Sequence, residues 1–423
     1  MLFIRDGYLI DPASGTQGRR DIIIEDGRIR RIGTDLRVPE GAKILDASGL
    51  TVCPGLIDTH AHFRDPGFTY KEDLTTGAAA ALRGGYTSVI LMANTNPPVD
   101  CPKVLEDILS RGKNLPLHLY SCANVTRGMA GRELCDLEAL AKAGAAGFTD
   151  DGLPVMDAGL LEEALIRAGK LGLPVSLHEE DKSYISENGI NAGSAAARKL
   201  NLTGSPREAE ISMIARDVGI AARTGSPLCI QHISTKEGVE LVRRARRDHP
   251  NIHAEATPHH FSLTEDALLT AGTLAKVNPP IRTEEDRQAI LRGLEDGTID
   301  IIATDHAPHA DFEKQKPFPE APSGMIGLET ALSLSLLHLV KRGHLSTMQM
   351  LACLTCHPAD FYHLPGGRVR EGAPADLTLF DPGEQWRVEP PFASRSSNSP
   401  FIGQMLPGVV YYTIVGGRIV YRK

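Results

Sequence analysis

Two histidines separated by a single residue, His60 and His62, are the first residues along the chain whose types and spacing indicate metal chemistry. Residues two apart on a β-strand point to the same face, so both imidazoles would face one ion. A pair of this kind standing alone favours two hydrogen-bonded histidines at a strand end. The metal interpretation therefore depends on which other residues lie beside the pair.

Four further candidate ligands follow the ends of later apolar runs: Asp151, His178, His232 and Asp305. None of them is informative alone, because a lone buried histidine is usually a hydrogen-bonded core residue. Together with the histidine pair they form a set of imidazoles and carboxylates without a thiolate, which suits zinc, manganese or cobalt. The joint pattern predicts a metal site.

Six candidate ligands exceed what one tetrahedral ion needs, so we expect two divalent ions, with zinc as the first choice, bridged by a carboxylate. Asp151 would be the bridge, with His60 and His62 on one ion and His178 and His232 on the other. Two such ions close together lower the pKa of a shared water toward neutrality. Spacing alone leaves the adjacent carboxylates Asp150 and Asp151 as alternatives for the bridge.

The middle of the chain must position these residues, and it alternates short apolar runs with helical stretches. The helical stretches include residues 71–83, 132–143, 157–171, 206–224 and 284–295. Ser205 is expected to cap the fourth helix, and Thr283 with Asp286 the fifth. The eight apolar runs are Leu50–Ile57, Thr87–Met92, Leu117–Cys122, Ala145–Thr149, Pro174–Leu177, Pro227–Ile230, Ile252–Ala256 and Ile299–Thr304.

Eight strands alternating with helices over about 250 residues are typical of a (β/α)8 TIM-like barrel, an α/β fold. Reactive residues in such barrels collect at the C-terminal ends of the strands, which is where all six candidate ligands fall. A doubly wound open sheet is the alternative, but no Gly-x-Gly-x-x-Gly follows the first strand.

Both ends of the chain have a different pattern, with short β-branched runs around turns such as Asp26-Gly27 and Gly416-Gly417. Because chain termini often lie close together, residues 1–50 and 365–423 are expected to form one small β-sandwich domain. Residues 51–364 would then form the metal-dependent catalytic barrel.

The composition excludes several classes of protein. Forty-five basic against fifty-three acidic residues give a net charge of −8, which disfavours a nucleic-acid binder, and 42% hydrophobic residues disfavour a disordered chain. No apolar stretch is long enough to cross a membrane, and the first eleven residues lack a signal-peptide pattern, so we expect a cytoplasmic protein. Seven cysteines, with one Cys-x-x-Cys at Cys353 and Cys356, argue against a disulfide framework.

Five motifs stand out along the chain: DTHAHFRDPG (58–67), MANT (92–95), TDDG (149–152), VNPPIR (277–282) and TDHAPH (304–309). With these motifs the chain resembles the amidohydrolase superfamily and, within it, the dihydroorotases of bacterial type. The resemblance implies the metal ligands His60, His62, Asp151, His178, His232 and Asp305. It favours Asp151 over Asp150, because Asp151 matches an aspartate bridge where many relatives have a carboxylated lysine.

The same resemblance implies a reaction and a substrate. The reaction is the reversible cyclisation of N-carbamoyl-L-aspartate to L-dihydroorotate and water in pyrimidine (UMP) biosynthesis, with Asp305 as the catalytic acid and base. Substrate-binding residues would be His62, Arg64, Asn94, Asn278, His309, Ser323 and Gly324. Arg64, Asn94 and His309 would hold the α-carboxylate, whereas Asn278 and the backbone of residues 323–324 would contact the ring.

Several alternatives stay open at this stage. A hydantoinase-like or allantoinase-like enzyme would use the same metal chemistry on a ring without the carboxylate, and a noncatalytic relative would serve as a scaffold for aspartate transcarbamoylase. A homodimer and an aspartate transcarbamoylase complex are both open as assemblies. The long connection from His309 to Ser323 is either a lid or a solvated surface loop.

Overall fold

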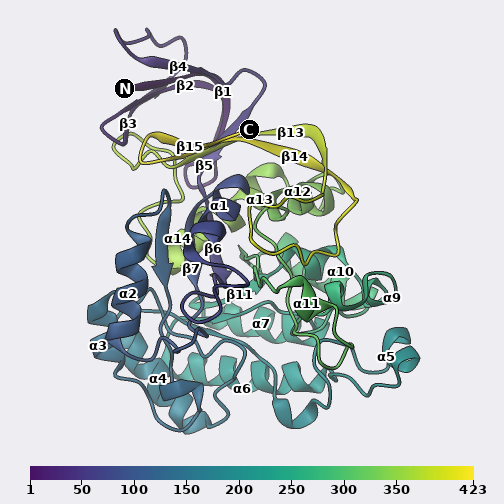
Figure 1. Cartoon of the computed structure of the whole chain (residues 1–423). Coiled ribbons are helices and arrows are strands. Elements are labelled where there is room, and N and C mark those ends of the chain that lie inside the picture. The colour runs from purple at the N-terminus through teal and green to yellow at the C-terminus, as the bar shows by residue number, and fades with distance from the viewer.

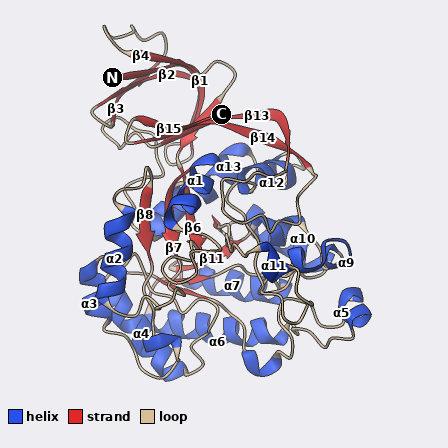
Figure 2. Ribbon diagram, viewed as in Figure 1, coloured by secondary structure: helices blue, strands red, loops and turns tan.

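A ring of parallel strands occupies the middle of the computed structural model, which describes all 423 residues. The chain order and neighbour pairing are those of a (β/α)8 barrel, so the predicted fold is confirmed. Figures 1 and 2 show the strands inside and the helices around them. The strands are β6 (Leu56–Ala61), β7 (Tyr86–Leu91), β8 (His118–Ser121), β9 (Val175–Leu177), β10 (Leu228–Ile230), β11 (Ile252–Ala256) and β12 (Ile301–Ile302).

The fourth position in the ring is held by a single residue rather than by a full strand. Phe148 pairs in parallel with Ala123 after β8 and with Val175 in β9, so it links the two sheets of the barrel. A parallel bridge between Ala61 and His306 closes the ring on the other side. The predicted run Ala145–Thr149 therefore occupies its expected place with only one bridged residue.

Helices surround the ring and lie close to their predicted ranges. Two further helical types occur: 3₁₀ turns at Arg127–Met129, Lys182–Tyr184 and Gly272–Ala275, and a π-helix at Leu336–Val340. The helices are α1 (Leu74–Arg83), α2 (Pro102–Gly112), α3 (Leu137–Ala143), α4 (Ala158–Lys170), α5 (Ala195–Leu200), α6 (Glu208–Thr224), α7 (Lys236–Asp248), α8 (Pro258–Ser262), α9 (Ala267–Ala271), α10 (Glu284–Glu295), α11 (Asp311–Lys314), α12 (Ala331–Ser335), α13 (Thr347–Leu354) and α14 (Cys356–Phe361).

The two predicted helix caps have different outcomes. Thr283 and Asp286 form a reciprocal capping box at the start of α10, as expected. The prediction that Ser205 caps the fourth helix was wrong. Helix α6 begins only at Glu208, and the side chain at its N-cap position, Arg207, makes no capping hydrogen bond. The Ser205 hydroxyl instead donates a buried hydrogen bond to Glu180 Oε1 at 3.2 Å.

The two ends of the chain form a second β structure beside the barrel (Figure 1). Its path is β15-β14-β13-β5-β1-β2-β3, with β4 paired to β1. Fifteen buried residues from both ends pack together in its core. The strands are β1 (Leu2–Asp11), β2 (Thr16–Glu25), β3 (Arg28–Gly33), β4 (Lys43–Asp46), β5 (Thr51–Pro54), β13 (Leu377–Arg387), β14 (Met405–Val415) and β15 (Arg418–Arg422).

The first predicted strand, Leu50–Ile57, is split between the two structures. Residues 51–54 form β5 of the terminal sheet, and the barrel begins with β6 at Leu56. Gly55 lies between them at a point where a Cβ atom would be 2.1 Å from Thr87 Oγ1, so only glycine fits. The domain boundaries at residues 50 and 365 stay predictions, with β5 belonging to the terminal sheet.

Two other features bear on the expectations from composition. All seven cysteines are free, and Cys353 and Cys356 are both buried. None of the helices combines the length and the apolar character needed to cross a bilayer.

Candidate metal centre and active site

The six predicted metal ligands come together at the C-terminal edge of the barrel. His60 lies in β6, and His62 follows its last residue, so both side chains project on the same side of the strand. Asp151 follows the Phe148 segment, whereas His178, His232 and Asp305 follow β9, β10 and β12. All six are buried. The parallel barrel thus brings residues that are up to 245 positions apart to one place.

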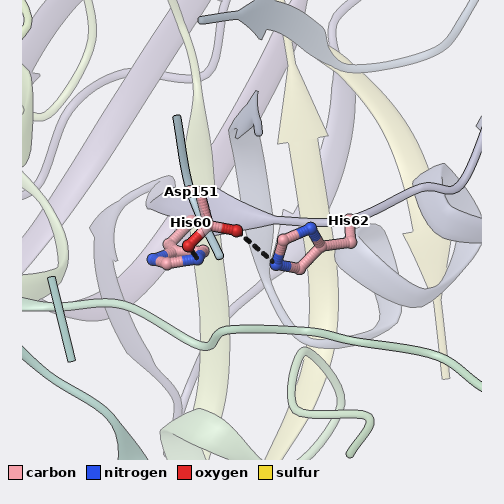
Figure 3. A group of neighbouring side chains, drawn as sticks. All are labelled: His60, His62 and Asp151. Atoms are coloured by element: carbon pink, nitrogen blue, oxygen red, sulfur yellow. Dashed lines mark ion pairs between the residues drawn. The ribbon is translucent and has the colours of Figure 1, made fainter. Parts of the chain in front are cut away.

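Asp151 is at the centre of this cluster. Its Oδ1 lies 3.5 Å from His60 Nε2, 3.6 Å from His178 Nδ1 and 3.8 Å from His232 Nε2, while Oδ2 lies 3.5 Å from His62 Nε2. Asp151 therefore belongs to two groups of possible metal ligands, one with His60 and His62 and one with His178 and His232. Figure 3 shows the first group, with the carboxylate beside one imidazole and reaching toward the other.

Asp305 adds a second carboxylate on the side of the first group. Its Oδ1 lies 3.1 Å from His62 Nε2 and 3.5 Å from His60 Nε2. Burial by itself would raise the pKa of Asp305, but the hydrogen bond from His62 and the nearby imidazoles lower that pKa below its usual range. Asp305 is therefore ionised at neutral pH.

The chemistry of this donor set fits a divalent metal. His60 Nε2, a fully buried nitrogen that faces both carboxylates, has no hydrogen-bond partner in the protein. Four imidazoles and two carboxylates in a buried space, without a lysine or arginine among them, favour a cation between them.

Three of the histidines are fixed from behind by acceptors. His60 Nδ1 lies 3.2 Å from Glu255 Oε2, His178 Nε2 lies 3.0 Å from Glu180 Oε2, and His62 Nδ1 lies 3.0 Å from Asn94 Oδ1. An acceptor at one ring nitrogen holds a proton there, so that the other nitrogen of the neutral ring would present its lone pair to a cation bound in the cluster. The imidazoles are thus preset as metal ligands.

Sequence reasoning missed Glu180 and Glu255. Glu180 is two residues beyond His178, so the same two-residue spacing that identified the histidine pair pointed to it. Glu255 lies inside an apolar run, where it is completely buried and also accepts from Thr59 Oγ1 at 2.6 Å. A carboxylate in a buried strand was the available signal, because such a group needs partners.

Asp150 and Asp151 have separate roles in the structure. The Asp150 carboxylate accepts from the backbone of Val125 at 2.9 Å and of Thr126 at 3.2 Å, and from the Asn124 amide at 3.2 Å. Burial raises the pKa of Asp150 to about 6 against the effect of these bonds. Asp150 braces the loop after β8, which leaves Asp151 as the bridging candidate.

Arg64 and His309, two of the residues predicted to bind the substrate carboxylate, lie side by side near the cluster. Arg64 Nε donates to the Pro308 carbonyl at 3.3 Å, and Arg64 Nη2 lies 3.4 Å from His309 Nε2. Asn94, the third predicted carboxylate ligand, has both ends of its amide on metal-site residues. Its Nδ2 donates to Asp151 Oδ2 at 2.9 Å, and its Oδ1 accepts from His62 Nδ1 at 3.0 Å.

The remaining predicted substrate residues form one wall. Ser323 Oγ donates to Asn278 Oδ1 at 3.2 Å, and the Ser323 carbonyl lies 2.8 Å from His309 Nε2. Gly324 has a φ of 135°, and a Cβ there would lie 2.7 Å from Ala307 Cβ and 3.0 Å from His309 Nε2. Glycine is thus required for this close approach.

The connection from His309 to Ser323 is tied down by two buried lysines. It contains the short helix α11, and Lys314 Nζ donates to the carbonyls of Pro322 at 2.8 Å and Gly324 at 3.0 Å. Lys276 Nζ donates to those of Phe318 and Ala321, both at 2.7 Å. Burial lowers the pKa of Lys276 to about 8 and that of Lys314 to about 7.

A barrel with this histidine and aspartate cluster defines a metal-dependent amidohydrolase, and the chain belongs to the amidohydrolase family, whose model matches residues 51–420. Several relatives that it matches over their full length are dihydroorotases. It is 50% identical to the dihydroorotase of Clostridium acetobutylicum over 422 residues, covering 100% of this chain and 99% of the relative. It is 47% identical to that of Lactococcus lactis over 421 residues, again covering 100% and 99%.

Solved structures give the same fold. The L-hydantoinase of Arthrobacter aurescens superposes with a TM-score of 0.88 at 25% identity, covering 100% of this chain and 96% of the other. A D-hydantoinase superposes with a TM-score of 0.87 at 23% identity, covering 100% and 95%. At 23% identity the second likeness shows the fold alone. The identity to the two dihydroorotases is about twice the identity to either hydantoinase.

Proposed function

We propose that this protein catalyses the reversible cyclisation of N-carbamoyl-L-aspartate to L-dihydroorotate and water in pyrimidine (UMP) biosynthesis. The observation that carries the choice of substrate is the placement of Arg64 and His309 beside the metal centre. Both compounds have an α-carboxylate, which a planar guanidinium binds through two charge-assisted bonds. Hydantoin and allantoin lack a carboxylate at that place.

The proposed metal centre holds two divalent ions, with zinc as the first candidate. His60, His62 and Asp305 would hold one ion, His178 and His232 the other, and Asp151 both. Bound there, the ions supply Lewis acidity toward a carbonyl oxygen and lower the pKa of a water. Their number and identity are measured by elemental analysis of the purified protein.

Asp305 is the proposed general base and acid. In the hydrolytic direction its ionised carboxylate takes a proton from the attacking water and gives that proton to the ring nitrogen as the C–N bond breaks. In the synthetic direction it removes a proton from the ureido nitrogen, which attacks the carbon of the protonated side-chain carboxyl group. Asp305 then gives this proton to the departing hydroxyl, which leaves as water. The lowered pKa of Asp305 keeps its carboxylate ionised at neutral pH.

The substrate is oriented by groups on both sides of the centre. Arg64 and His309 bind its carboxylate, with Asn94 and His62 at the border between that site and the metal ligands. Asn278 and the Ser323-Gly324 backbone would contact the edge of the ring, because they form the adjacent wall.

The deciding experiment is an assay of the purified protein with dihydroorotate, hydantoin and allantoin. We expect dihydroorotate to be hydrolysed fastest, and faster turnover of a ring without the carboxylate would overturn the proposal. A protein with no bound metal and no turnover, even with aspartate transcarbamoylase present, would instead be a noncatalytic scaffold.

Assembly and location stay predictions. A homodimer and a complex with aspartate transcarbamoylase are tested by light scattering of the protein alone and mixed with the transferase. A cytoplasmic location is tested by fractionation of the source cells.

A further inference from the structure

The connection between β13 and β14 leaves the terminal sheet and reaches the edge of the active site. Figure 1 shows this yellow segment descending from the sheet toward the barrel. Asn398 lies in it, with only 1% of its surface exposed. Asn398 belongs to the part of the chain that we assigned to the terminal domain, so nothing in the barrel pattern pointed to it.

The Asn398 side chain contacts two active-site segments at once. Its Oδ1 accepts from the backbone N–H of His309 at 3.1 Å. Its Nδ2 donates to the carbonyls of Ala307 and Gly324, both at 3.1 Å. Next to it, the Asn398 carbonyl accepts from the Ile326 N–H at 3.0 Å. Both donors and the acceptor of the amide are therefore used within the protein.

These two segments carry residues of the proposed substrate site. The first, residues 306–309, ends in His309, and the second, residues 323–326, begins with Ser323 and Gly324. They also meet directly, since the Ala307 N–H donates to the Met325 carbonyl at 2.8 Å and Gly324 packs against Ala307. A shift of either segment would move His309 relative to the ring-binding wall.

We propose that Asn398 is a positioning residue that holds His309 and Gly324 in the arrangement that binds the substrate. The inference rests on the proposed function for the identity of the substrate, while the bonds themselves are independent of it. Only an amide of this size offers one acceptor and two donors here. An aspartate would direct a carboxylate oxygen at two carbonyl oxygens, so it would lose both donated bonds.

The test compares Asn398→Ala and Asn398→Asp with Ser397→Ala in the metal-loaded protein. Ser397 is a suitable control because it is the adjacent residue and its hydroxyl bonds only to Asp311 Oδ1, at 2.8 Å on the surface. We expect both Asn398 variants to raise KM for dihydroorotate roughly tenfold or more while kcat changes less than about threefold, because ground-state binding is lost. The Ser397 variant should match the wild type.

Amide hydrogen exchange of the folded proteins without substrate supplies a second readout. Exchange should accelerate in residues 305–311 and 322–328 of Asn398→Ala, but not in β6 or β10. KM within twofold of the wild type in folded Asn398 variants would overturn the inference, as would unchanged exchange in both segments. If the wild type does not turn over dihydroorotate, the proposed function fails, and the exchange result alone decides whether Asn398 positions these segments.

Discussion

Lys71 donates a hydrogen bond to Nδ1 of His309, with 3.2 Å between the two nitrogens. An ammonium group has only donors, so Nδ1 must be the unprotonated nitrogen of the ring. The proton is then on Nε2, which donates to the Ser323 carbonyl at 2.8 Å. Lys71 is itself held by Glu313 through an ion pair of 2.9 Å. This relationship fixes His309 as a neutral ring whose Nε2–H is held by the Ser323 carbonyl, beside Arg64.

Replacing Lys71 by methionine should make substrate binding depend on pH. Burial lowers the pKa of His309, and so do the charges of Arg64, Lys71 and Lys314, so the wild-type ring stays neutral across the physiological range. Without Lys71 one of the charges that lower the pKa of His309 is gone. The proton of the ring can then move to Nδ1, which lies 3.8 Å from Glu313 Oε2. At high pH the neutral ring of the variant then carries its single proton on Nδ1 and none on Nε2. At low pH both nitrogens are protonated, so the Nε2–H returns.

We therefore expect KM for dihydroorotate in Lys71→Met to be several-fold above the wild type at pH 8 and to approach it as the pH falls below 6. The exposed Lys316→Met is the matched control. A KM that follows the wild type at every pH would show that Lys71 does not set the state of His309.

Asp305→Asn should remove turnover while the protein still folds. The amide keeps the size of the side chain but cannot accept the proton, so kcat is expected to fall by about 10²–10⁴-fold. Steady-state kinetics measure the loss, with metal content determined on the same sample so that loss of the ions is recognised. A metal-loaded variant with wild-type kcat would exclude Asp305 as the base.

Arg64→Ala should weaken binding of the carboxylate more than it slows the chemical step. Hydrogen bonds to charged groups contribute about 1.5–3 kcal/mol, so KM for dihydroorotate should rise about 10–100-fold. Arg64→Lys should restore only part of the binding, because an ammonium lacks the planar fork. Any residual activity on hydantoin serves as an internal control, since that ring has no carboxylate to lose. Equal losses on both substrates would place Arg64 outside the carboxylate site.

The sequence predicted most of the barrel because its signals are local and periodic. Helix α10 begins and ends at its predicted residues, since the capping Thr283 and the apolar spacing act within a few residues. The six predicted ligands come together in the structure because parallel strands share one C-terminal edge, a rule that needs only the strand ends. The strand break at Gly55 depends on Thr87 of the neighbouring strand, and no local pattern reports such a contact.

The supporting residues of the site were the harder part. Lys71 and Asn398 act across 238 and 89 positions of sequence, through bonds to His309 that neither residue type nor spacing indicates. Asn94 was expected on the substrate carboxylate, but its two hydrogen bonds to His62 and Asp151 emerge only once three strands are placed. Such contacts follow from tertiary packing, whereas the ligands follow from strand order.

Glu255→Gln should weaken metal binding without unfolding the barrel. Glu255 Oε2 lies 3.2 Å from His60 Nδ1, and its charge increases the basicity of the ring nitrogen that faces the cluster. The glutamine keeps an acceptor for Thr59 but removes the charge, so the affinity of the metal-free protein for zinc should fall about 10–100-fold. Titration with a competing zinc chelator measures the affinity, and the exposed Glu320→Gln is the control. Unchanged affinity would show that Glu255 does not tune His60 as a metal ligand and contributes only to the packing of β11.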